Sequence, residues 1–415
     1  MYEWSDTDVI MRQTMRAFLD KEVRPHLDAL ESGELSPYPI ARKLFSEFGL
    51  DVMAAEAVKG MLEKERARQH SEAEKPPSEE GGGLSGVGAQ ASMAVAMIAE
   101  IAGVSIGLLS TVGVSLGLGA ATIVSRGTLA QKERWLPELM TLEKIAAWAI
   151  TEPDAGSDAF GGMKTYVKRD GGDYVLNGQK TFITNGPNAD VLIVYAKLDE
   201  GDQEDKRNRK VLTFVLDAGM PGLVQGKAFK KMGMMSSPTG ELFFDDVRLT
   251  PDRLLGETEN HTGGDGRDSA RANFVAERVG IAAMSLGIIN ECHRLCIDYA
   301  KTRTLWGKEI GQFQLIQLKL AKMEVARMNV QNMVFQTLEK MQAGKLPSLG
   351  EASAIKWYSS EAATDVAMDA VQLFGGNGYM TEYRVEQLAR DAKSLMIYAG
   401  SNEVQITHVA KGLLG

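Results

Sequence analysis

The spacing of apolar residues changes twice along the chain, and this restricts the possible folds more than any other feature. Up to about residue 145, apolar residues recur every three or four positions, as on one face of an α-helix. From about Ala146 to Gly256 they alternate with polar residues, which is the period of a β-strand. After "GGDGRDS" the helical period returns. The sequence therefore predicts an N-terminal helical domain (1–145), a middle β domain (146–256) and a C-terminal helical bundle (257–415).

The middle part contains one strong turn signal. Asn177-Gly178 lies inside "DYVLNGQKTFIT", between two alternating segments. An Asn-Gly pair in this context favours a tight β-hairpin turn, because both residues accept positive φ. We therefore expect a hairpin centred on this pair, followed by strands in "DVLIVYAKL", "KVLTFVLDA" and "GELFFDDVRL".

The composition argues against several classes of protein. The net charge of -9 over 415 residues provides no general basic surface for nucleic acid. Residues 101–125 carry no charge and are long enough to span a bilayer. However, Ser and Gly recur within them and no basic cluster flanks them, so we expect a buried core helix and no membrane span.

The two cysteines, Cys292 and Cys296, lie four positions apart on a predicted helix, where His293 points to another face. Two thiolates alone rarely hold zinc, so we expect no metal site. Reduced cysteines and the lack of a secretory signal at the N-terminus predict a cytoplasmic protein. Residues 57–90 are charged and then rich in Pro and Gly, which is typical of a charged surface insertion.

The chain has no Walker-type, Rossmann-type or HExxH motif, and its five histidines are dispersed. It has four polar loops that contain glycine instead. Such loops offer backbone N–H groups that can hold an anionic cofactor without Rossmann geometry. They are "TEPDAGSD" (151–158), "FITNG" (182–186), "QLFGGNGY" (372–379) and "AGSNE" (399–403).

These loops and their flanking residues resemble those of the acyl-CoA dehydrogenases. The resemblance rests on "WAITEPDAGSD", "QKTFITNGPNADV", "TRTLWGKEIGQFQLIQ" and "QLFGGNGYMTEYRVEQLARDAK", which occur in the family's order over most of the chain. It implies an N-terminal α-helical domain, a middle β-barrel or sandwich domain and a C-terminal four-helix bundle. Residues 57–90 are longer and more charged than the corresponding family segment.

The resemblance also implies an activity. The family uses FAD to dehydrogenate an acyl-CoA thioester between its α and β carbons, which gives the trans-2-enoyl-CoA. A carboxylate takes the α proton and the β hydrogen leaves as hydride to flavin N5. The implied partners are the acyl-CoA substrate, an electron-transfer flavoprotein that accepts the electrons, and further copies of this chain, at least a dimer and usually a tetramer. The implied setting is fatty acid and lipid metabolism.

Matching the family's motifs residue by residue gives the expected cofactor contacts. Those to the chain's own FAD are Trp148, Ile150, Thr151, Ser157, Phe182, Thr184, Ser401 and Glu403. Those to the FAD of a neighbouring subunit are Arg303, Trp306, Gln314, Gln372 and Gly376. The expected substrate contacts are Ser157, Phe274, Arg278 and Gly400.

The expected catalytic base is displaced from its usual place. Many family members have "IYEGTNE", with the base at the glutamate, where this chain has "IYAGSNE" and Ala399. A subset that includes isovaleryl-CoA and long-chain acyl-CoA dehydrogenases takes the base from a Glu-Arg pair on another helix. This chain has such a pair in "NFVAERVG", as Glu277 and Arg278. Apolar neighbours would raise the proton affinity of Glu277, and the backbone N–H of Ala399 would still face the thioester oxygen.

Two other functions fit the same motifs. One is an acyl-CoA oxidase or another flavin oxidase or monooxygenase of the superfamily, in which oxygen reoxidises the flavin. The other is a non-catalytic flavin-binding protein, which the retained Glu277 and the acidic composition disfavour.

Overall fold

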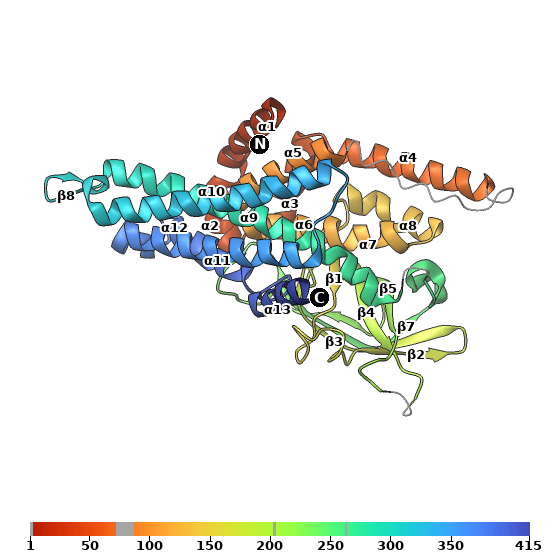
Figure 1. The fold of residues 1–415 in the computed structure, drawn as a ribbon. Helices are drawn as coiled ribbons and strands as arrows, with labels where there is room; N and C mark the ends of the chain where they lie inside the picture. Colours follow the sequence, from red (N-terminus) through yellow and green to blue (C-terminus); the bar gives the residue numbers. More distant parts are fainter. Residues whose placement is uncertain (1–2, 72–86, 202–204, 262–263) are drawn as a thin grey trace.

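The computed structural model describes residues 3–71, 87–201, 205–261 and 264–415. The chain runs through helices, then a β-sheet, then helices again, so the predicted fold class is confirmed. Figure 1 shows the N-terminal helices (red to orange) and the C-terminal helices (green-blue to blue) in one long helical body, with the sheet below one end.

The N-terminal helices begin with residues that the sequence selects for this position. At the start of α1, Ser5 and Asp8 form a capping box, and Thr128 and Gln131 do the same at α8. The helices of this part are α1 (Asp6–Glu22), α2 (Leu27–Ser32), α3 (Pro37–Glu47), α4 (Leu50–Ser71), α5 (Val87–Ala102), α6 (Ile106–Gly113), α7 (Ala121–Arg126) and α8 (Leu129–Met140).

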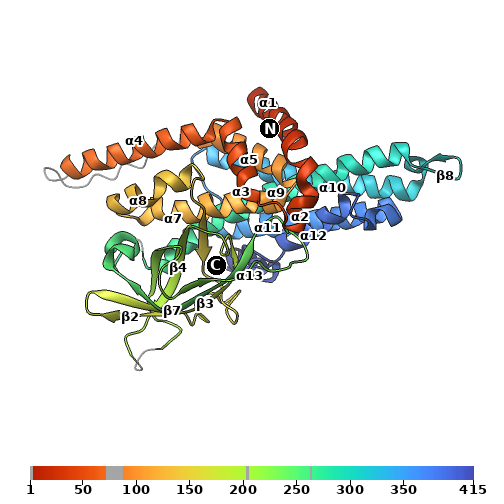
Figure 2. The same cartoon turned by 180° about the vertical axis from the view of Figure 1, so that it is seen from behind.

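The long helix α4 includes the first part of the predicted insertion. From Val58 onward it lies along α8, where Val58 and Leu62 are buried in one cluster with Trp135 and Leu136. Figure 2 shows α4 extending beyond the rest of the helical body. Residues 72–86 of the predicted insertion lie outside the described residues.

The uncharged segment forms a continuous helix that changes its winding. α6 passes into a π-helical stretch, Val114–Ala120, and then into α7. By length and composition the helix Ile106–Arg126 could span a membrane, but 61% of its most apolar window is buried inside the protein. A Cβ added to Gly119 would lie 2.5 Å from Ala146 Cβ, so this helix packs directly on the first strand.

The β part is a single seven-stranded sheet that forms an open half-barrel. β1 and β2 pair in parallel with successive parts of β4, while β5 pairs antiparallel with its other edge. β3 joins β2 to β7, and β6 lies at the far edge. The strands are β1 (Ala146–Ala149), β2 (Tyr166–Asp170), β3 (Asp173–Thr184), β4 (Val191–Leu198), β5 (Val211–Asp217), β6 (Leu223–Gln225) and β7 (Thr239–Leu249).

The hairpin predicted at Asn177-Gly178 is wrong. β3 continues through this pair, and the turn lies at Gly171 and Gly172, because Asp170 pairs with Asp173. Gly178 has a φ of 142°, and its register against β7 shifts as in a β-bulge. A Cβ there would lie 2.5 Å from Thr165 Oγ1. The glycine therefore permits a close approach between strands and does not form a turn.

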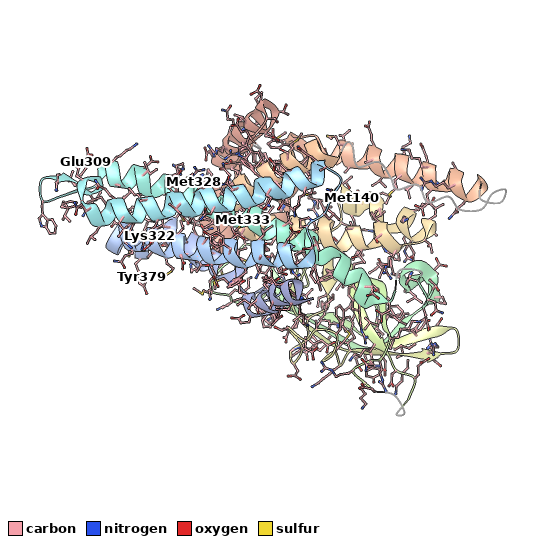
Figure 3. All side chains as sticks on the ribbon, in the orientation of Figure 1. Met140, Glu309, Lys322, Met328, Met333 and Tyr379 are labelled. Carbon is pink, nitrogen blue, oxygen red and sulfur yellow. The ribbon has the colours of Figure 1, made fainter. Side chains whose placement is uncertain are left out.

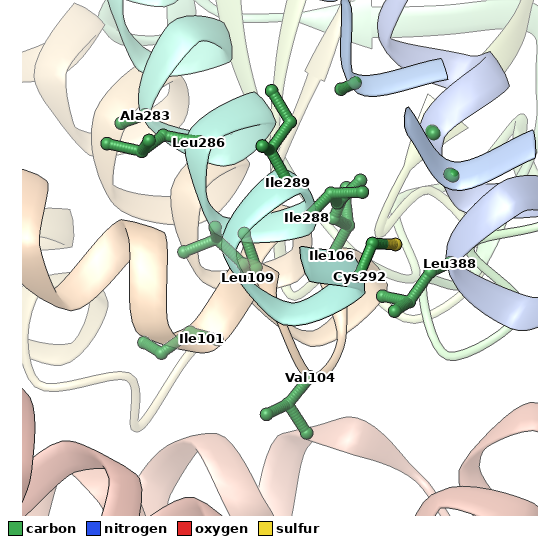
Figure 4. Packing of buried hydrophobic residues seen from close by; sticks show 14 of the residues in the cluster. Ile101, Val104, Ile106, Leu109, Ala283, Leu286, Ile288, Ile289, Cys292 and Leu388 are labelled. Atoms are coloured by element: carbon green, nitrogen blue, oxygen red, sulfur yellow. The ribbon is translucent and has the colours of Figure 1, made fainter. Parts of the chain in front are cut away.

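The C-terminal helices form the predicted bundle and share one core with the N-terminal helices. Figure 4 shows Ile288 and Cys292 of α9 packed with Ile106 and Leu109 of α6 and with Leu388 of α12. Both cysteines are buried, and burial raises the pKa of each thiol. The elements are α9 (Gly266–Thr302), a short hairpin of β8 (Thr304–Leu305) and β9 (Lys308–Glu309), α10 (Gln314–Gln342), α11 (Leu349–Phe374), α12 (Val385–Leu395) and α13 (Asn402–Leu414).

Candidate functional site

Glu277 lies in the first third of α9, where it is partly buried. Burial raises the pKa of its carboxyl to about 7, although the positive charges of Arg278 and Lys356 oppose this. Tyr398 directly precedes Ala399, the predicted amide donor. Burial raises the pKa of its phenol, and the nearby charge of Glu277 raises that pKa further. A carboxyl with this pKa is half ionised near neutral pH and can accept a proton there.

Arg278, the next residue, is buried beside Glu277. Its Nη1 donates to Ser353 Oγ of α11 at 3.1 Å, and its guanidinium lies 5.7 Å from the centre of the Phe274 ring. Burial lowers the pKa of the guanidinium, while Glu277 raises it. Arg278 Nη2 is 3.9 Å from the position that a Cβ of Gly400 would occupy. The structure thus brings Glu277 and Arg278 of α9 to the loop that follows α12, with the Phe274 ring beside the Arg278 guanidinium.

That loop has an unusual backbone. Ala399 and Gly400 have positive φ values of 57° and 81°, in the left-handed region. Gln405 Nε2 of α13 donates to the carbonyls of Ala399 and Gly400, at 3.0 and 2.8 Å. Within the described residues, the Ala399 N–H makes no backbone hydrogen bond. Both carbonyls are therefore held by α13, and the N–H remains free to bind a ligand oxygen.

Lys356 of α11 is a member of this cluster that the sequence analysis missed. Its side chain is fully buried, and its Nζ lies 2.9 Å from the Gly400 carbonyl oxygen and 2.8 Å from Asn402 Oδ1. Burial lowers its pKa to about 8, as does Arg278, while Glu277 opposes the shift. The sequence signal that could have indicated this residue is a lysine among the mostly apolar and small residues of "EASAIKWYSS".

The predicted flavin-ring residues lie in β1 and directly after it, and at the end of β3. Trp148 of β1 packs edge-on to Tyr195, with ring centres 5.4 Å apart. Lys180 Nζ holds the carbonyl of Ile150 at 2.9 Å, and the Thr181 N–H holds that of Thr151 at 2.9 Å.

Two features of this region fit a planar aromatic cofactor. Trp148 Nε1 is buried without a hydrogen-bond partner in the described part of the chain. Phe182, at a φ of 57°, exposes 66% of its surface beside Phe229. α13 starts at Ser401 without a side-chain cap, but its first two N–H groups have partners within the chain: that of Asn402 donates to the Met396 carbonyl at 3.0 Å, and that of Glu403 to its own carboxylate. In both views α13 lies beside the sheet (Figures 1 and 2).

The other predicted contacts of this group are placed as follows. Ser157 is exposed in the loop after β1, and Thr184 is partly buried at the end of β3. Glu403, in the first turn of α13, is exposed, and a hydrogen bond from its own backbone N–H lowers its pKa.

Five predicted residues lie elsewhere, at the tip of the bundle away from the sheet. They sit at the β8–β9 hairpin, the start of α10 and the end of α11. Figure 3 shows Glu309 and Tyr379, their neighbours in sequence, at this tip. One chain therefore does not bring them to Trp148 and Phe182. All five are exposed: Arg303, Trp306, Gln314, Gln372 and Gly376.

Three family profiles match this chain in order. "Acyl-CoA dehydrogenase, N-terminal domain" matches residues 76–143, "Acyl-CoA dehydrogenase, middle domain" residues 147–247, and "Acyl-CoA dehydrogenase, C-terminal domain" residues 264–414. They describe a class of flavin-dependent oxidoreductases. The chain belongs to the acyl-CoA dehydrogenase family.

Individual relatives are similar over their whole length. An acyl-CoA dehydrogenase of Bacillus subtilis (strain 168) is 34% identical over 407 residues, 98% of each chain. The structure of butyryl-CoA dehydrogenase from Megasphaera elsdenii is 32% identical, covers 100% of both chains and has a TM-score of 0.83. A glutaryl-CoA dehydrogenase from Mycobacterium smegmatis in complex with FADH2 is 25% identical, covers 99% of this chain and 95% of its own, and has a TM-score of 0.82. The cofactor of this chain is FAD.

Proposed function

We propose that this chain dehydrogenates an acyl-CoA thioester to the trans-2-enoyl-CoA, with Glu277 as the base that takes the α proton. The observation that carries the proposal is the pairing of a partly buried Glu277, whose pKa is raised to about 7, with a bare Ala399 in the adjacent loop. The site thus has a carboxylate suited to the reaction on α9, while the usual position of the base holds no side chain that could act.

The Ala399 N–H supplies the second element of the reaction. Loss of the α proton places negative charge on the thioester oxygen, and a fixed N–H donor stabilises that charge. Within the described residues this N–H makes no backbone hydrogen bond, and the Gln405 side-chain amide donates to the carbonyls of Ala399 and Gly400. We assign Phe274, Arg278 and Gly400, with Ser157, to the substrate; Arg278 lies beside both Phe274 and Gly400.

FAD, when bound, supplies the acceptor for the hydride that leaves the β carbon. The residues that would hold it lie in β1 and the loop after it, at the end of β3 and at the start of α13. These are Trp148, Ile150, Thr151, Ser157, Phe182, Thr184, Ser401 and Glu403.

Completion of the cofactor site requires a second copy of the chain. Trp306 exposes 83% of its surface and Tyr379 86%, at the tip of the bundle. Large aromatic residues this exposed are typical of a surface that another protein covers. We therefore assign Arg303, Trp306, Gln314, Gln372 and Gly376 to the FAD of a neighbouring subunit, in a dimer or tetramer. An electron-transfer flavoprotein is the proposed acceptor of the electrons.

The proposed position of the base supports an assignment to the subset that includes isovaleryl-CoA and long-chain acyl-CoA dehydrogenases. Gly280, about one turn after Glu277, has open space where a Cβ would be, which leaves room for a branched or long acyl chain.

The test is a panel of straight and branched acyl-CoAs mixed anaerobically with the FAD-loaded protein while flavin absorbance is followed. Wild type should be bleached by at least one of them. Glu277→Gln should bind FAD and acyl-CoA but bleach more slowly by a factor of roughly 10³ or more, because no other carboxyl replaces the base. Glu339→Gln, an exposed residue of α10, is the matched control.

Two outcomes would contradict the proposal. Bleaching of Glu277→Gln at the wild-type rate would assign the base to another group. Rapid reoxidation of the reduced flavin by oxygen with product bound would favour an oxidase.

A further inference from the structure

The strongest unassigned feature near the proposed site is the buried ammonium of Lys356. Its two acceptors, the Gly400 carbonyl and Asn402 Oδ1, lie on the loop and on the first residue of α13. Ser360 Oγ lies 3.1 Å from the same Asn402 oxygen. A buried charge is costly unless it is hydrogen-bonded, so these contacts fix both the lysine and the segment that it holds.

These contacts determine the orientation of the loop. The Gly400 carbonyl accepts from Lys356 on one element and from Gln405 on another, at 2.9 and 2.8 Å. Two successive residues with positive φ are held in this way. A left-handed backbone is unfavourable for alanine, so it persists only where surrounding contacts impose it. Without the lysine, the Gly400–Ser401 peptide would have one anchor fewer, and the loop that carries the Ala399 N–H would be held less firmly.

We propose that Lys356 is a positioning residue for abstraction of the α proton, an inference that rests on the proposed function. Its ammonium holds the loop so that the Ala399 N–H is directed toward the thioester oxygen, and its positive charge stabilises the Glu277 carboxylate. Lys356 does not touch the reacting carbons in this scheme. It acts through the loop and through the base.

The charged and titratable groups around Glu277 and Lys356 come from α9, α11, α13 and the loop after α12. Glu277 is near Arg278 on its own helix, Lys356 on α11 and Tyr398 in the loop after α12. Lys356 is near Arg278 and Glu277 of α9, Glu403 of α13 and Glu361 of α11. Removal of the lysine charge leaves Arg278 as the remaining cation close to Glu277 in this part of the described structure. The carboxylate should then hold its proton more tightly.

The first test needs no substrate. Hydrogen exchange of a peptide spanning residues 396–402 is measured by mass spectrometry in the full-length FAD-loaded protein. In Lys356→Met the amides of this loop should exchange roughly tenfold faster than in wild type, because one anchor of the loop is lost. Lys319→Met is the matched control, since Lys319 of α10 pairs with Asp369 of α11 away from the loop. Its loop exchange should equal that of wild type.

The second test is the pH dependence of anaerobic flavin bleaching at saturating and at low acyl-CoA. In Lys356→Met the maximal rate should fall roughly 10- to 100-fold, with a smaller change in KM, because a displaced donor acts mainly in the transition state. The acidic limb of the profile should move to higher pH by about half a unit or more. A purely structural lysine would leave that limb in place. Lys356→Gln, which lacks the charge but keeps a donor, should shift the limb with less effect on loop exchange.

Where Lys356→Met does not fold, Asn402→Ala removes one of the lysine's two acceptors and keeps its charge. It should speed loop exchange and leave the acidic limb unchanged. The inference is overturned if loop exchange and the limb both stay at their wild-type values in the folded variants. If wild type is bleached by no acyl-CoA, the proposed function fails, while the exchange result still decides whether Lys356 holds the loop.

Discussion

Lys180 Nζ lies 2.9 Å from Glu152 Oε1 and 2.9 Å from the carbonyl of Ile150, and both charged side chains are closed off from solvent. The pair connects β3 to the segment that follows β1. Burial lowers the pKa of Lys180 to about 8, while the charge of Glu152 opposes this. Glu152 also accepts the N–H groups of Lys164 and Thr165, at 2.6 and 3.0 Å. The ion pair thus holds the strand end that would carry the flavin contacts.

Lys180→Met should destabilise the protein by about 3–5 kcal/mol, because it leaves the Glu152 carboxylate buried without its partner. The measurement is denaturant unfolding of purified protein. Lys164→Met removes an ion pair to Asp154 whose side chains are 73% and 70% exposed, and should change stability far less than Lys180→Met does, because solvent screens the exposed pair. Equal effects of the two substitutions would show that burial does not determine the cost.

Two glycines of α9 should respond oppositely to alanine. A Cβ at Gly287 would lie 2.2 Å from the Ala99 carbonyl oxygen, so Gly287→Ala forces α5 and α9 apart and should cost about 2 kcal/mol or more. At Gly280 nothing lies within 4 Å, and Gly280→Ala should stabilise the helix by about 0.5–1 kcal/mol. Thermal and denaturant unfolding measure both changes. Equal destabilisation by both would contradict the close helix crossing.

Glu277→Gln should stabilise the protein in a pH-dependent way. The folded-state pKa of about 7 lies above the ordinary value of 4.5, so the folded protein binds more protons than the unfolded chain between these pH values. Stability therefore falls as pH rises from 4.5 to 7, and the full cost of the ionised group applies above pH 7. The glutamine should add roughly 2–3 kcal/mol at pH 8 and almost nothing at pH 4.5. A pH-independent difference in denaturant unfolding would contradict the raised pKa.

The backbone at Ala399 predicts a difference between glycine and valine. At a φ of 57°, Ala399→Gly relieves left-handed strain and should raise stability by up to about 1 kcal/mol. Ala399→Val should lower stability by more than about 1 kcal/mol, because a branched Cβ is disfavoured there. Unfolding of the two variants side by side gives the comparison. Valine at least as stable as alanine would mean that the loop has another backbone conformation.

The change of apolar spacing was enough to predict the helical–β–helical order, because it reports which faces are buried. It failed at Asn177-Gly178, where local turn preference is outweighed by pairing along the whole of β3 and by the close approach of Thr165. Gly171-Gly172, a less specific signal, forms the turn.

The candidate site was only partly predictable for a similar reason. Glu277 and Ala399 could be related through known motifs, but no local pattern connects Lys356 to Gly400, 44 positions away. That contact depends on how α11 packs against α13. The residues at the tip of the bundle do not come near the other predicted cofactor contacts of the same chain. The apolar period of one chain carries no information about contacts with a second chain.

Asn185 is fully buried, and its Nδ2 donates to the carbonyls of Thr111 and Ala146, at 3.0 and 2.9 Å. Ser115 Oγ accepts the Ala146 N–H, so both polar groups of that residue are bound by its surroundings. Hydrogen bonds on both sides of Ala146 therefore fix α6 and the π-helical stretch after it against β1, the strand that carries Trp148. A shift of this helix would therefore also displace the strand that carries Trp148, so a substitution at Asn185 should affect the proposed flavin contacts from a distance.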